Sequence, residues 1–158
     1  MGGVVQSKNT LMVRRIFYPL LVLFSFSGGA HGVGLSITRE KAIFLEDQDT
    51  VLVYQAGKTS LNGAFTRAHY IHPIYGLDGA VLTEDFPEDH LHHRGLFWAW
   101  HQLYIGDSRI GDGWEIKDFS WDVMAVDSVV TGAASKSLKA AVFWKSPQYT
   151  DANGLQKP

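Results

Sequence analysis

The residues of this chain best suited to chemistry are histidines, three of which fall within four positions at His90, His92 and His93. An imidazole titrates near neutral pH, so it can donate or accept a proton, and a neighbouring carboxylate or cation tunes it. Arg94 follows directly and offers a planar set of donors to a carboxylate or a polyol. We therefore expect His90, His92, His93 and Arg94 to form the reacting centre of a functional loop over residues 85–95.

A metal site is an alternative interpretation of the same residues. In an extended segment side chains alternate, so His90 and His92 would share one face and His93 would point to the other. Two imidazoles on one face, with His72 or His101 as a third ligand, would suit zinc, copper or iron, although the spacing fits no strict metal motif. A divalent metal ion is therefore one candidate cofactor. The flanking carboxylates that could bind the ion or orient the imidazoles are Asp85, Glu88 and Asp89.

Tryptophans near the histidines indicate what the ligand could be. Trp98, Trp100 and Trp114 offer flat apolar faces suited to stacking on sugar rings, although packing in the core is an equal alternative for each. A strand over this region would place Trp98 and Trp100 on one face and His101 on the other. These features favour a saccharide or another small-molecule ligand, and the residues expected to bind it are His72, Asp85, Trp98, Trp100, His101 and Trp114. A non-catalytic interaction domain with structural histidines is a third hypothesis.

The elements that must position these residues are predicted to be strands. Short runs rich in β-branched and aromatic residues alternate with turn residues, and no ten residues carry a clear apolar stripe at helical spacing. We expect an all-β domain over residues 33–158, built as an antiparallel β-sandwich. The predicted strands cover residues 35–38, 41–45, 50–54, 68–75, 80–83, 96–105, 121–130 and 137–145.

Composition excludes several classes of function. The 158 residues suit one domain, and the formal net charge is -2. Three of the 14 basic residues precede the first apolar run, which leaves 11 against 16 acidic ones, so no basic face for nucleic acid is expected. The chain has no cysteine, which excludes disulfides, thiolate metal sites and cysteine nucleophiles. It also has no nucleophile elbow and no glycine-rich phosphate loop.

The first residues have the three parts of a secretory signal in the usual order. Arg14 and Arg15 precede an apolar run over 16–26, and small residues follow over 27–32. A membrane-spanning helix needs about 20 apolar residues, and this run is shorter. We expect residues 1–32 to be a signal peptide, cleaved after Ala30 or Gly32, and the mature protein to be periplasmic or extracellular. There is no second apolar run, so no membrane span is expected after cleavage.

The end of the sequence is typical of an unfinished domain. Residues 140–144 form a good strand, and Asn153-Gly154 is a strong hairpin signal that calls for a returning strand. The sequence stops at Pro158, so we expect this chain to be a truncated form of a longer protein.

A family resemblance rests on two segments, Tyr70-Ile-His-Pro73 and Asp89-His-Leu-His-His-Arg-Gly95. They resemble the Tyr-x-His-Pro and Asp-His-x-x-His-x-Gly segments of the PmoA-like family, which bears the name methane oxygenase PmoA. The resemblance covers roughly residues 67–114 and implies a longer, exported bacterial protein associated with carbohydrate breakdown. The family name implies a metal-dependent oxygenase, but the membrane-spanning helices of the methane monooxygenase subunit have no counterpart in the mature chain.

The histidine-rich loop also resembles that of galactose-mutarotase-like β-sandwiches. In those enzymes a histidine acid works with a carboxylate base from the later half of the fold. The resemblance implies that His90 or His93 is the acid, that the base lies beyond Pro158, and that any activity is of the epimerase, lyase or hydrolase type.

Overall fold

The computed structural model describes residues 32–132, 135–155 and 157, so the predicted signal peptide lies outside it except for Gly32. Within the described residues every regular element is a strand and none is a helix, which confirms the all-β prediction. No helix among these residues is long and apolar enough to cross a membrane.

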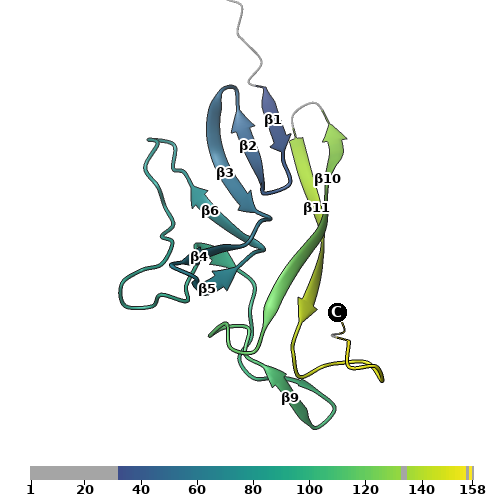
Figure 1. The fold of residues 1–158 in the computed structure, drawn as a ribbon. Coiled ribbons are helices and arrows are strands. Elements are labelled where there is room, and N and C mark those ends of the chain that lie inside the picture. The colour runs from purple at the N-terminus through teal and green to yellow at the C-terminus, as the bar shows by residue number, and fades with distance from the viewer. Residues whose placement is uncertain (1–31, 133–134, 156, 158) are drawn as a thin grey trace, which may run out of the picture.

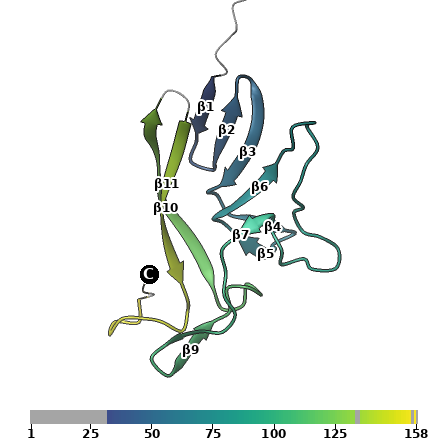
Figure 2. The same ribbon diagram turned by 180° about the vertical axis from the view of Figure 1, so that it is seen from behind.

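The largest sheet has five antiparallel strands in the order β1-β2-β3-β6-β7. Three further antiparallel hairpins accompany it, and the longest of them runs beside the β1 edge of the large sheet (Figures 1 and 2). The strands of the sheet are β1 (Val33–Ile37), β2 (Lys41–Glu46), β3 (Asp49–Gln55), β6 (Tyr70–Ile74) and β7 (Leu96–Phe97). The hairpins pair β4 (Thr59–Leu61) with β5 (Ala64–Arg67), β8 (Leu103–Ile105) with β9 (Ser108–Gly111), and β10 (Ser120–Gly132) with β11 (Ser135–Lys145).

Two apolar clusters join these sheets face to face, as in a β-sandwich. One contains the buried residues Ala42, Tyr54 and Ala56 of the large sheet and its β3 end. Its partly buried members come from β1 and β6 of that sheet and from β10 and β11 of the long hairpin. The second contains Ala68, Phe119 and Trp121, and side chains of β8, β9 and β11 pack against it. Removing apolar surface from water is the main force that holds such layers together. The second cluster lies under the segment that carries the candidate site.

The predicted strand over residues 96–105 is wrong in its middle. β7 ends at Phe97 and β8 begins at Leu103, and the residues between them form no strand. The carbonyl oxygen of Trp100 instead accepts hydrogen bonds from the backbone N–H groups of Gly113 and Trp114, at 3.1 and 3.2 Å. Because no strand alternation operates here, the expected opposite placement of Trp98 and Trp100 against His101 has no basis. The predicted strand over 80–83 likewise reduces to a single bridge between Val81 and Tyr75.

A short hairpin was missed although the sequence carries its signal. The β4–β5 turn is Asn62-Gly63, with φ of 51° and 86°, the backbone that this dipeptide adopts in tight hairpins. The other such dipeptide, Asn153-Gly154, was predicted to reverse the chain and does. The N–H of Asp151 donates to Leu155 at 2.7 Å, and that of Lys157 donates to Tyr149 at 2.9 Å.

Candidate functional site

The loop that carries the three clustered histidines is closed at its base by a backbone bridge between Asp85 and Arg94. Inside it the chain turns, because the N–H of His93 donates to the carbonyl of His90 at 2.8 Å. The extended conformation expected for this segment is therefore wrong. The turn stacks the His90 ring on the His93 ring, with centroids 4.8 Å apart and planes at 11°. The His92 ring stands edge-on to that of His93 at 4.5 Å, so all three imidazoles lie together.

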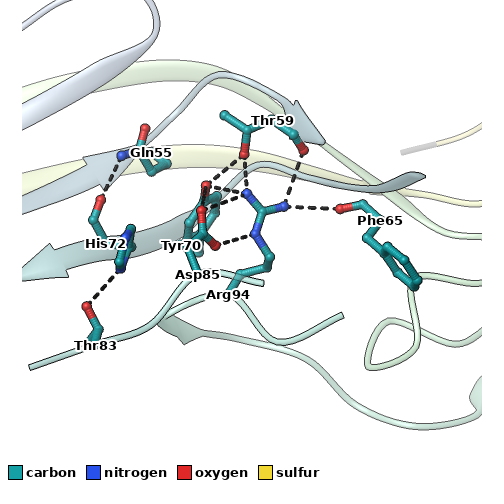
Figure 3. A network of polar contacts seen from close by, with 8 residues as sticks. All are labelled: Gln55, Thr59, Phe65, Tyr70, His72, Thr83, Asp85 and Arg94. Atoms are coloured by element: carbon teal, nitrogen blue, oxygen red, sulfur yellow. Dashed lines mark hydrogen bonds and ion pairs between the residues drawn. The ribbon is translucent and has the colours of Figure 1, made fainter. Parts of the chain in front are cut away.

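Arg94 is fully buried, and its guanidinium group is bonded entirely within the protein (Figure 3). Nε and Nη2 donate to the two carboxylate oxygens of Asp85. Nη1 donates to the carbonyl oxygens of Thr59 and Phe65, at 3.3 and 3.1 Å. Nη2 also reaches the hydroxyls of Thr59 and Tyr70. All five N–H groups of the arginine thus have acceptors within the chain.

This arrangement corrects the expected role of Arg94 and Asp85. A ligand would have to displace an internal acceptor to reach the guanidinium, which also lies over the ring of Phe86 at 3.7 Å. Arg94 and Asp85 therefore hold the base of the histidine loop against the β4–β5 hairpin, and neither is placed to contact a ligand. One ring nitrogen of His72 also has an internal partner, since its Nδ1 lies 2.9 Å from the hydroxyl of Thr83 (Figure 3).

Trp114 brings two groups of predicted site residues together. Its ring lies 5.2 Å from the ring of His93 and 6.4 Å from that of His92. It also lies 5.5 Å from the ring of His101, which is far from the loop in sequence. Trp98 and Trp100 are 66% and 54% exposed. Trp100 also contacts the ring of Trp144 at 5.3 Å.

His101 forms a pair with a buried carboxylate that sequence reasoning missed. Nδ1 of His101 lies 3.0 Å from Oδ2 of Asp112; the His101 side chain is 55% exposed and that of Asp112 is 4% exposed. Burial alone would raise the pKa of Asp112, but hydrogen bonds from the backbone N–H of Glu115, from His101 and from the N–H of Gln102 lower it to about 2. The ionised carboxylate can only accept a hydrogen bond, so Nδ1 carries the proton and Nε2 is left as the basic atom.

The same residues form a candidate metal-binding group. Among the described residues, ligand atoms of His101, Asp112 and Glu115 lie within 4.8 Å of one another, and this group contains neither His90 nor His92. The carboxylate of Asp112 already accepts four hydrogen bonds, however, and Nη2 of Arg109 lies 3.7 Å from its Oδ2. Oδ1 accepts from the N–H groups of Trp114 and Glu115, both at 3.0 Å, and Oδ2 accepts from His101 and from the N–H of Gln102. A cation would have to compete with these bonds, so the geometry favours a histidine–carboxylate pair over a metal site.

Both Asp112 and Arg67 were missed by sequence reasoning. Asp112 lies between Gly111 and Gly113, and the glycines there suggested only a turn. Arg67 ends β5, is 1% exposed, and donates from Nη2 to the carbonyl oxygen of Gly113 at 2.7 Å. Its guanidinium lies between two aromatic rings, 4.4 Å from the centroid of Phe97 and 4.2 Å from that of Trp121. No local sequence pattern signals such a position, because the contacts come from distant segments.

Two histidines are expected to make the folded state less stable as the pH falls. Burial, then Arg67, lowers the pKa of His69; burial, then His93 and His90, lowers that of His92. On acidification from about pH 7.5 to about pH 5.5, the unfolded chain takes up protons at these positions before the folded chain does, so the free energy of unfolding decreases. Urea midpoints at the two pH values should show this decrease, and it should be smaller in the His69→Gln/His92→Gln double variant. An unchanged or rising midpoint in the parent protein would contradict it.

Comparison with known proteins yields one family. A model described as "Family of unknown function (DUF6807)" matches residues 43–152, a span that includes the histidine loop, Trp114 and the His101–Asp112 pair. No curated protein and no solved structure matches the chain.

Proposed function

We propose that this chain, a member of the DUF6807 family of unknown function, is an exported protein that binds or acts on a carbohydrate. The proposed chemistry is acid–base catalysis by histidine. One observation carries the proposal. A half-exposed histidine, His101, is oriented by the buried carboxylate of Asp112 at 3.0 Å, beside the ring of Trp114. Export rests on the signal-like sequence of residues 14–32.

The pair has the elements that a general acid–base group requires. Asp112 holds the imidazole of His101 in one tautomer and stabilises the imidazolium that forms when Nε2 takes a proton. Asp112 cannot easily be neutralised, because its pKa is held at about 2. Nε2 of this half-exposed imidazole can then take a proton from a sugar hydroxyl or from an activated water, and can return it to a leaving oxygen. This residue replaces Arg94 in the reacting centre that we expected from the sequence.

The aromatic residues around the pair support a sugar as the ligand. Trp98 and Trp100 lie three residues and one residue before His101 and keep more than half of their surfaces exposed, which leaves apolar surface that a ligand could cover. A pyranose ring has one face of C–H groups that packs on an indole and hydroxyls around its rim for polar partners. His92 and His93 lie on the same tryptophan ring, Trp114, as His101, so they would line the same site.

The proposal predicts separate losses of turnover and of affinity. In a panel of plant and bacterial oligosaccharides, the best ligand should lose about 10²-fold or more in turnover with His101→Gln or Asp112→Asn, while its affinity changes little. Trp98→Ala with Trp100→Ala should weaken binding by about tenfold or more. Asp107→Asn, which removes an exposed carboxylate in the β8–β9 turn, is the matched control and should change neither quantity.

Calorimetric titration and product analysis by NMR measure the two effects. If no saccharide binds the purified protein, the carbohydrate assignment fails. If a saccharide binds and His101→Gln turns over at the parent rate, the acid–base role fails. If no turnover is detected and the substitutions lower stability alone, the histidines are structural and the protein is an interaction domain.

A further inference from the structure

The described part of the chain buries two arginines, and only one of them has a negative partner. Arg94 is 0% exposed and bonds to the carboxylate of Asp85. Arg67 is 1% exposed, and none of the ion pairs among the described residues involves it. Its bonded acceptors are the neutral carbonyl oxygens of Gly113 and Trp114, at 2.7 and 3.3 Å from Nη2.

Arg67 also has donors with no acceptor. Nε and Nη1 are buried and have no hydrogen-bond partner among the described residues. Burial lowers the pKa of Arg67 to about 10, so the group is still a cation at neutral pH. Burying a charge without a partner is strongly unfavourable, and leaving its donors unpaired adds to the penalty. The site therefore calls for a group that brings both negative charge and acceptor oxygens.

Besides Nε1 of Trp121, whose ring packs on Arg67, two buried imidazole nitrogens without partners belong to the same neighbourhood. They are Nε2 of His92 and Nε2 of His93. The His93 ring lies 5.8 Å from the ring of Phe97, over which the guanidinium of Arg67 sits at 4.4 Å. The charge of Arg67 also acts on His92, whose pKa it helps to lower after burial and the neighbouring histidines. Imidazole N–H groups and a guanidinium are donors of the kind that bind carboxylates.

We infer that the saccharide taken by this site carries a carboxylate, as a uronic acid does, and that Arg67 holds it together with His92 and His93. The inference rests on the proposed function, because it names the class of saccharide for that site. The sugar ring then lies towards Trp114 and the exposed edge of His101. A charge-assisted hydrogen bond is stronger than a neutral one, which gives the acidic sugar its advantage over a neutral analogue.

Binding must include a movement of side chains. The unpartnered nitrogens of Arg67, His92 and His93 have essentially no contact with solvent. Trp114 packs on both histidine rings, and its own carbonyl oxygen accepts from Arg67, so we expect its ring to shift when the ligand enters.

The test compares sugars that differ only in the carboxyl group. Uronate-containing oligosaccharides are titrated into the purified protein beside their methyl esters and their carboxyl-reduced neutral forms, with sodium acetate and inorganic phosphate as simple anions. We expect the free acid to bind about tenfold or more tightly than its ester and its neutral form. His92→Gln should reduce this preference, and Arg67→Met should abolish it if that variant folds. Arg39→Met, which removes an exposed arginine, should leave the preference intact.

The parent protein and its ligand series decide the question even if Arg67→Met fails to fold. Equal affinity for the acid, the ester and the neutral form would overturn this inference and leave the carbohydrate proposal standing. Binding of no saccharide at all would overturn both. Acetate or phosphate that binds as tightly as the uronate would show a simple anion site and would overturn the saccharide class.

Discussion

Replacing Arg94 with methionine is expected to lower the free energy of unfolding by about 3–5 kcal/mol, the range seen when one partner of a buried ion pair is removed. The guanidinium is fully buried and is the only cation within ion-pair distance of Asp85 among the described residues. Its loss would leave the mostly buried Asp85 carboxylate without a cation and would remove a donor from the carbonyl of Phe65. The hydroxyls of Thr59 and Tyr70 would keep the 2.7 Å hydrogen bond between them. Urea denaturation followed by tryptophan fluorescence measures the change.

Two further variants make this prediction specific. Arg39→Met removes an arginine that is exposed, and it should change the free energy of unfolding by no more than about 0.5 kcal/mol. Asp85→Leu in the Arg94→Met background removes both charges, and it should recover part of the loss because no unpaired charge stays buried. An Arg94→Met protein as stable as the Arg39→Met protein would show that the network adds nothing to stability.

Replacing Gly95 with alanine should destabilise the fold by about 2–5 kcal/mol, from two separate causes. Gly95 has φ of +56°, in the left-handed region, and a Cβ there would lie 2.3 Å from the carbonyl oxygen of Ile71 and 2.8 Å from Cβ of His72. Backbone atoms of β6 cannot move away cheaply, because Ile71 is paired on both sides of its strand. The close approach of Gly95 to β6 is what allows β7 and Arg94 to lie where they do.

Gly106→Ala is the matched control, because it separates the two causes. Gly106 has φ of +58°, nearly the same backbone conformation, and an added Cβ would meet nothing within 4 Å. It should therefore show only the left-handed penalty, about 1–2 kcal/mol. The difference between the two variants, read from urea denaturation, measures the steric part at Gly95. If the two variants are equally stable, the contact with Ile71 is not close in solution.

Much of the architecture could be predicted because it depends on local pattern. The segments that form β1, β2 and β3 are short runs rich in β-branched and aromatic residues, and turn residues separate the segments. The strand pattern is therefore visible in the sequence itself. The long strands β10 and β11 were predicted for the same reason. The break between Phe97 and Leu103 could not be predicted, because the backbone bonds of that segment go to residues 113 and 114, which no local window contains.

The candidate site divides in the same way. Sequence reasoning singled out His101, Trp114 and the histidine triplet as candidates because their types and density are unusual, and the structure brings their rings together. It misjudged Arg94, since a run of polar residues does not reveal which one points inward. Asp112 and Arg67 were missed because one stands between glycines and the other at the end of a short strand. The His101–Asp112 and Arg67–Gly113 contacts join residues that lie 11 and 46 positions apart, which no local pattern reveals.

The sequence by itself determined the kind of protein this is: an all-β chain with strand-length apolar periods, a signal-like start, no cysteine and more acidic than basic residues. It also determined which reactive side chains are present, because the numbers of imidazole and indole rings follow from the composition. Only the tertiary structure decided which groups meet. Burial gave Arg94 a carboxylate and left Arg67 without one, and it placed a buried Asp112 behind an exposed His101. Charge pairing and burial are set by contacts between distant segments, and these are the properties on which the function of the site depends.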